Sequence, residues 1–162
     1  MVQIKPFKGT RPYNESAENL IAPSTDYLTE ERIVDIFEKN YWNYLKILNP
    51  VGQNKESDAL KTAKNHFSEM KQNNIIKQDY DLCYYVYQIK TNNHNQIGFL
   101  AIANIDLFIS KNIIKGHELT YENRTKERSE QILNLESQIG PIYLTYKDNS
   151  DLDDFLFQLT LN

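Results

Sequence analysis

The chain has 162 residues, of which 40% are hydrophobic and 25% are charged, and its formal net charge at pH 7 is -4. This balance is typical of a folded globular protein and excludes a disordered chain. The negative net charge argues against general nucleic-acid binding, which usually requires clustered lysines and arginines.

Residues 1–9 contain two lysines but no apolar segment like that of a signal peptide, and no run reaches membrane-spanning length. The one cysteine, Cys83, excludes an internal disulfide and is interpreted as a small core residue. We therefore expect a cytoplasmic protein without membrane contact, folded as a single domain over residues 1–162.

The N-terminal third predicts a strand, a loop and a helix. Residues 2–7 form the strand, and residues 10–26, interrupted by two prolines, form an irregular segment. Thr29 is the expected N-cap of a helix that ends near Asn40. Residues 44–48 predict a short strand, which the following Asn-Pro pair ends.

The middle of the chain predicts a helix followed by a β-hairpin. Ser57 is the expected helix cap, and the inward positions at helical spacing are Leu60, Ala63, Phe67 and Met70. The hairpin strands are residues 82–90 and 96–104, with Gly98 marking a bulge or a close backbone approach. The 11 tyrosines and 7 phenylalanines are interpreted mainly as rings that cover a half-buried sheet face.

The C-terminal third predicts two further helices and a strand. Asp106 caps a short helical turn, and a longer helix begins near Asn123 and stops at Gly140-Pro141. Residues 142–146 predict a strand, and Ser150 is the expected cap of a last helix that runs to Asn162 without a stop signal. Its inward positions are Leu152, Phe155, Leu156 and Leu159. Together these elements predict an α/β (α+β) fold, with a mixed sheet that contains the central hairpin and helices packed on it.

One stretch of the chain has the residue pattern of an anion-binding site. The apolar run Ile113-Ile114 is followed by Lys115-Gly116, then by His117-Glu118 and Thr120, and a helix follows at once. A strand end, a glycine turn and a helix N-terminus together commonly form an anion site, because free N–H groups and the helix dipole point at the ligand.

Each residue of this stretch has two interpretations. His117 and Glu118 act as a general base and its orienting partner, or they belong to a surface loop with local hydrogen bonds. Thr120 is a phosphate ligand or a plain helix N-cap, and Arg128 holds a phosphate or pairs with glutamates on a solvated helix face. Arg11, in the early irregular segment, is a bidentate phosphate clamp or an exposed loop arginine.

Asp26 is a proton acceptor or Mg²⁺ ligand in the first interpretation, and a turn cap in the second. No histidine or acidic residue has the spacing of a standard zinc site, so we predict no metal site built by the chain alone. His66 and His94 receive no role.

The chain resembles a bacterial and archaeal family known as domain-of-unknown-function family 1015. The matching pieces are Ile4-Lys5-Pro6-Phe7-x-Gly9-x-Arg11-Pro12, Ile21-Ala22-Pro23 with Asp26, Lys115-Gly116-His117-Glu118-x-Thr120 with Arg128, and Gly140-Pro141-Ile142-Tyr143-Leu144-Thr145-Tyr146. The chain departs from the family pattern at Ser24-Thr25, Gly116 and Tyr121.

The family is longer than this chain, and further along it carries an aspartate–glycine–histidine–histidine–arginine stretch. That stretch is similar to one in free-serine kinases of the ParB/sulfiredoxin-like superfamily, and the three histidines here, none adjacent to another, do not reproduce it. The resemblance implies that the chain is a fragment or a shortened member, the N-terminal part of a longer architecture. The exposed or partner-covered stripe of the last helix would then be Leu152, Phe155 and Leu159.

The first functional hypothesis is a phosphotransferase-type domain that binds a nucleotide, with Mg²⁺, or another small phosphorylated molecule. Lys115, Thr120, Arg128 and Arg11 would hold the phosphate, and Glu118 or His117 would transfer the proton. The alternative hypothesis is a non-catalytic interaction or scaffold domain, whose aromatic-rich sheet meets a C-terminal domain or a second copy of the chain.

Overall fold

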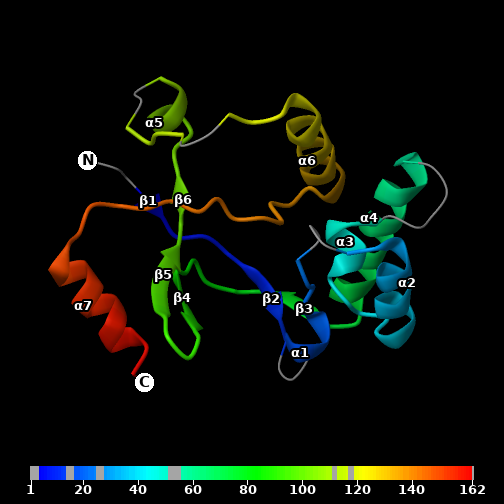
Figure 1. Ribbon diagram of the computed structural model, residues 1–162, viewed down its shortest axis with the longest axis horizontal. Helices are drawn as coiled ribbons and strands as arrows, with labels where there is room; N and C mark the ends of the chain where they lie inside the picture. The colour runs from blue at the N-terminus through cyan, green and yellow to red at the C-terminus, as the bar shows by residue number, and fades with distance from the viewer. Residues whose placement is uncertain are drawn as a thin grey trace. The chain divides into compact units, whose positions relative to one another are not determined.

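The computed structural model describes residues 4–13, 17–24, 28–50, 56–110, 113–116 and 119–161 (Figure 1). The chain groups into two compact units. Unit 1 comprises Met1–Gly9, Asp79–Leu119 and Gly140–Asn162, and unit 2 comprises Thr10–Gln78 and Thr120–Ile139. Both units mix helices with strands, which confirms the α/β class.

Unit 2 is mainly helical. Its helices are α1 (Ala17–Leu20), α2 (Glu30–Lys39), α3 (Leu45–Leu48), α4 (Glu56–Gln72) and α6 (Glu122–Leu135), and its strands are β2 (Thr10–Pro12) and β3 (Ile76–Gln78). The two strands are antiparallel, with Arg11 opposite Lys77. Residues 10–12, predicted to be irregular, therefore form a strand, because they pair with residues that lie far along the chain.

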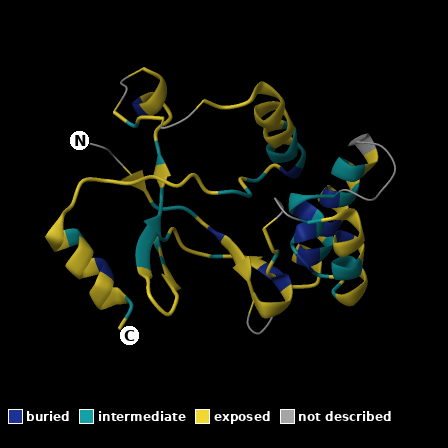
Figure 2. Cartoon of the chain, viewed as in Figure 1, coloured by how far each residue is buried: buried dark blue, intermediate teal, exposed yellow. Residues whose placement is uncertain are grey.

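The core of unit 2 lies between its helices. It consists of Leu20, Ile47, Ala63, Phe67, Met70, Ile76 and Leu135. Figure 2 shows these buried positions on α3 and α4 as dark segments. The predicted inward positions Ala63, Phe67 and Met70 of α4 are confirmed, because helical spacing places them on one face.

The predicted cap of α2 is confirmed, and two neighbouring predictions are wrong. Thr29 accepts a hydrogen bond from the Arg32 amide at 3.3 Å, and the helix ends at Lys39. Helix α4 begins at Glu56, so Ser57 lies inside it. Residues 45–48 form α3 and not a strand: the Asn43 side chain accepts a hydrogen bond from the Leu45 amide at 2.9 Å and starts a helical turn.

Unit 1 is built around a hairpin. Strands β4 (Tyr85–Lys90) and β5 (Asn95–Leu100) pair antiparallel from Tyr85–Leu100 to Lys90–Asn95, which confirms the predicted hairpin. At Gly98, a Cβ atom would lie 2.6 Å from the Tyr87 ring, so the predicted close approach is also confirmed. A second ladder joins β1 (Ile4–Lys5) to β6 (Ile102–Ala103). The described strands thus form three two-stranded antiparallel ladders.

Helices α5 (Asp106–Ile109) and α7 (Ser150–Leu159) complete the described elements of unit 1. Figure 1 shows α7 beside the hairpin, and its contacts there are with β5. The predicted caps are each wrong by one residue: the N-cap of α5 is Ile105, which makes no side-chain capping bond, and that of α7 is Asn149, which accepts from the Leu152 amide at 3.1 Å.

Three further predictions about the C-terminal third are wrong. Helix α6 ends at Leu135, because Glu136 adopts a left-handed conformation with φ of 52° well before Gly140. Residues 142–146 form no strand. Helix α7 does not run to the end of the chain, since the Thr160 amide bonds to carbonyls of the last turn and its hydroxyl donates to the Phe157 carbonyl at 2.8 Å.

Candidate anion-binding site

The predicted site residues lie in different parts of the chain. Lys115 belongs to unit 1, whereas Arg11, Thr120 and Arg128 belong to unit 2. The candidate catalytic pair, His117 and Glu118, lies outside the described residues, as does Asp26. That these groups surround one anion therefore stays a prediction.

The residues before the site form no strand. Residues 113–116 have no regular structure, and the amides of Ile113 and Ile114 both donate to the Leu107 carbonyl, at 2.8 and 3.0 Å. The Leu107 carbonyl of α5 therefore fixes the start of this segment. At Gly116, a Cβ atom would have ordinary contacts with the Phe108 ring at 3.6 Å, so space does not require a glycine there.

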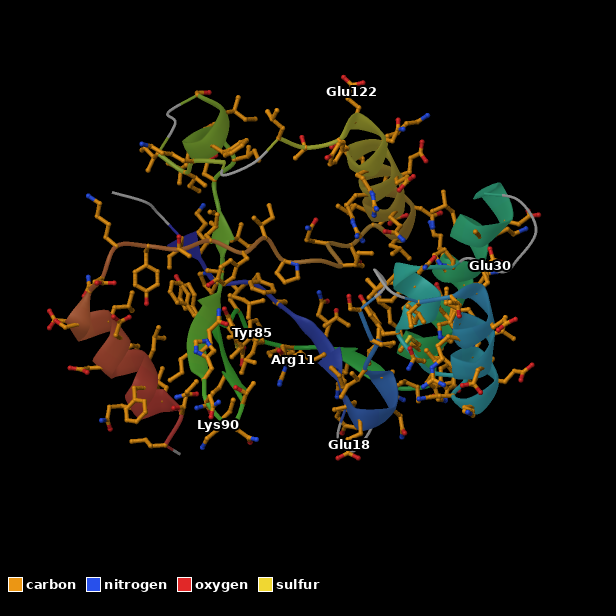
Figure 3. All side chains as sticks on the ribbon, viewed as in Figure 1. Arg11, Glu18, Glu30, Tyr85, Lys90 and Glu122 are labelled. Atoms are coloured by element: carbon orange, nitrogen blue, oxygen red, sulfur yellow. The ribbon has the colours of Figure 1, made fainter. Side chains whose placement is uncertain are left out.

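The N-terminal end of α6 has no side-chain cap. Its N-cap residue is Tyr121, whose side chain makes no capping hydrogen bond, so Thr120 is not the cap. The first helical bond runs from the Thr125 amide to the Tyr121 carbonyl at 3.0 Å. The amides of Glu122, Asn123 and Arg124 consequently have no partner within the helix. Glu122, labelled in Figure 3, marks this end.

Arg128 is held by a glutamine that sequence analysis missed. Its guanidinium donates to the Gln131 Oε1 atom at 2.9 Å. The Gln131 Nε2 atom in turn donates to the carbonyls of Ile47 and Leu48 at 3.2 and 2.9 Å, which ties α6 to α3. The i,i+3 spacing on a helix signals the first contact, but the second depends on tertiary packing.

The arginines of α6 lack the glutamate partners that were expected for a solvated helix face. Among the described residues, the ion pair of this helix joins Lys126 to Glu130 at 3.9 Å, and none is found for Arg124 or Arg128. Residues four apart lie on the same side of a helix, so the two guanidinium groups share one face. The positive end of the helix dipole adds to their field.

Arg11 is placed by the β2–β3 ladder. It stands opposite Lys77 and is exposed, so two cationic residues face each other across the two strands. The Lys77 ammonium also lies 5.0 Å from the centre of the Tyr13 ring. A ladder of this kind gives Arg11 a firmer position than the predicted loop would.

A cluster of titratable side chains that sequence analysis also missed lies elsewhere in unit 2. His66 of α4 is 5% exposed, and its ring is stacked on Trp42 and meets the Tyr41 ring edge-on. Its Nε2 atom has no hydrogen-bond partner. Burial, followed by the charge of Lys46, lowers the pKa of His66, and Glu69 partly opposes this. The arrangement therefore disfavours the protonated imidazole.

The partners of His66 are themselves linked. The Tyr41 hydroxyl donates to the Glu69 carboxylate at 2.7 Å, which raises the pKa of Tyr41. The Lys46 ammonium lies 4.2 Å from the centre of the Tyr41 ring. Burial lowers the pKa of Lys46. These contacts join α4 to the segment before α3, so the cluster is explained as packing.

Within the described part of the chain, no group of three histidine, cysteine or acidic side chains could hold a metal ion. None of the described helices is both long and apolar enough to cross a membrane.

Fold and site together define an α/β protein with an uncapped, arginine-bearing helix terminus. A family model described as "Protein of unknown function (DUF1015)" matches residues 4–162, and the chain belongs to this family. The resemblance inferred from its motifs is thereby confirmed. No curated protein and no solved structure matches the chain significantly.

Proposed function

We propose that the N-terminal end of α6 binds the phosphate group of a small phosphorylated molecule, as part of a phosphotransferase-type domain. The observation that carries the proposal is the combination of an uncapped first turn with two arginines, Arg124 and Arg128, that have no carboxylate partner among the described residues.

The chemistry of these groups matches a phosphate. Free amides at a helix terminus donate hydrogen bonds to anionic oxygens, and a guanidinium can donate two parallel bonds to a phosphate. Gln131 accepts one hydrogen bond from the Arg128 guanidinium, which has further N–H donors for an anion. Arg11, Lys115 and Thr120 are proposed as further phosphate contacts. A nucleotide with Mg²⁺ is the proposed ligand class, and Glu118 or His117 is the proposed proton acceptor.

Calorimetric titration with inorganic phosphate and with Mg-ATP tests this proposal. We expect saturable binding by the wild-type chain and a loss of about tenfold in affinity for Arg128→Gln, equivalent to roughly 1.4 kcal/mol. Lys126→Gln is the matched control, because it removes the same charge from the same helix where Glu130 already pairs with it. Equal weakening by both variants would indicate only general electrostatic attraction and would contradict the site.

The alternative function, a non-catalytic interaction or scaffold domain, is favoured by a different observation. Unit 1 exposes many large apolar side chains, including those of residues 142–144 and of α7. Exposed apolar patches of this kind commonly mark protein-interaction surfaces. Both functions can coexist, because no residue belongs to both sets.

A further inference from the structure

The apolar arc of α7 is wider than the surface that covers it. Leu152 and Leu156 are four residues apart and form the inner stripe, in which Leu156 is 4% exposed. Phe155 and Leu159, also four apart, flank this stripe, but Phe155 is 59% exposed. Phe157 lies on the opposite flank and is exposed as well. An amphipathic helix normally buries its whole apolar arc, so α7 has room for a second packing surface.

Of the charged residues at positions 147–154, four are acidic and one, Lys147, is basic. Asp148, Asp151 and Asp154 have no ion pair within the described part of the chain, and Asp153 accepts a hydrogen bond from the Tyr146 hydroxyl at 2.6 Å. This hydrogen bond, together with burial, raises the pKa of Tyr146 to about 12. Carboxylates at a helix N-terminus are favourable by themselves, but Asp154 lies beyond the first turn.

A hollow in this region is lined by both apolar and acidic side chains. It has a volume of about 380 Å³, lies between β5 and α7, and is lined by Asn95, Ile97, Asp153, Asp154, Leu156 and Phe157. The side chains of Ile97, Leu156 and Phe157 suit an aliphatic stem, and the two carboxylates suit a cation at the end of that stem. A lysine or arginine side chain has this chemistry.

We propose that α7 and the adjoining edge of β5 dock a basic amphipathic segment of a partner protein. One lysine or arginine of the segment would enter the hollow beside Asp153 and Asp154. Its apolar residues would cover Phe155 and Leu159. The proposal follows from charge complementarity, because a partner that covers these flanks must compensate carboxylates that have no cation of their own. It gives the interaction function a partner class and does not depend on phosphate binding by unit 2.

A pair of short labelled peptides tests the docking site. Both place leucines on one helical face, and the other face carries lysines in the first peptide and glutamates in the second. Fluorescence anisotropy with the full chain should show saturable one-to-one binding of the lysine peptide and none of the glutamate peptide. Asp154→Asn and Phe155→Ser should each weaken binding by roughly tenfold or more, as expected for residues central to an interface.

The controls carry the same chemical changes on unit 2. Asp58→Asn and Val34→Ser alter an exposed acidic and an exposed apolar residue of its helices, and should leave peptide binding unchanged. Circular dichroism checks that every variant is folded.

Equal binding of both peptides, or unchanged affinity in Asp154→Asn and Phe155→Ser, would overturn the proposal. Self-association that Phe155→Ser abolishes, without peptide binding, would overturn it in favour of a second copy. Arg128→Gln should not affect peptide binding, which separates this test from that of phosphate binding.

Discussion

The two compact units differ in how they are stabilised. Unit 2 has a core in which Ile47 of α3 and Phe67 and Met70 of α4 belong to one cluster. Unit 1 has a regular hairpin, but within the described residues its buried hydrophobic side chains are Leu107 and Leu156. Hydrogen-bonded ladders give unit 1 its form, whereas burial of apolar area supplies most of the folding free energy in globular proteins. Regular secondary structure alone therefore does not indicate a self-sufficient core.

The largest expected effect is in the core of unit 2. Phe67→Ala should lower the free energy of unfolding by roughly 3–5 kcal/mol, because it empties a buried aromatic site. Phe155→Ala on α7 should cost far less, about 0.5 kcal/mol or below, because the side chain is exposed. Urea denaturation followed by fluorescence measures the first change, since the single tryptophan, Trp42, packs against the same core. Equal costs for the two variants would contradict the difference between the units.

A smaller effect is expected where hydrogen bonds stabilise unit 1. The Tyr85 hydroxyl accepts from the Gly9 amide at 2.6 Å and donates to Asp79 at 2.7 Å. The Tyr85 ring also packs 4.9 Å from the centre of Phe7. Tyr85→Phe keeps the ring and leaves the amide and carboxylate without this partner, at a cost of about 1–2 kcal/mol.

Hydrogen exchange measures this loss at the Gly9 amide, which should exchange faster in Tyr85→Phe. The Phe67 amide of unit 2 serves as the internal reference. An unchanged rate at Gly9 would mean that the ladder holds this segment without the tyrosine.

The smallest effect is a pH dependence of unit 2. The folded-state pKa of His66 is lowered below its ordinary value of 6.5, so the unfolded chain binds more protons as the pH falls below that value. The stability of unit 2 should therefore be complete above about pH 6.5 and decrease as the pH falls toward the folded-state pKa.

Denaturation curves at pH 7.5 and 5 measure this dependence, with His66→Phe as the comparison. The variant keeps an aromatic ring beside Trp42 but removes the titrating group, so the part of the pH dependence due to His66 should disappear. The same dependence in both proteins would assign it to groups other than His66.

Local patterns predicted the parts of the fold that depend on local forces. The spacing of Ala63, Phe67 and Met70 identified the inner face of α4, and Thr29 identified the start of α2. The strand prediction for residues 44–48 is wrong, because the backbone forms a helical turn there. Leu45 and Ile47 nevertheless alternate with less buried residues, as they would in a strand. The β2–β3 ladder could not be predicted from strands of three residues, because it depends on distant pairing.

The candidate site was predicted only in outline. The sequence predicts the start of a helix with basic residues after Gly116, but its N-cap is Tyr121. The partner of Arg128 is Gln131 and not one of the predicted glutamates. The anchoring of Gln131 on the carbonyls of α3 requires two helices to meet, so no local pattern contains it. The roles of His117 and Glu118 stay predictions.

The most direct test of the account follows the backbone amides while inorganic phosphate is added. In a nitrogen–proton correlation spectrum, the amides of Glu122, Asn123 and Arg124 should shift in a saturable way, because they have no partner within α6. Amides of α7 should stay in place, and Arg128→Gln should shift the titration to higher phosphate concentration. Absence of any shift at residues 122–124, or equal shifts beside all exposed lysines of both units, would contradict an anion site at this helix terminus.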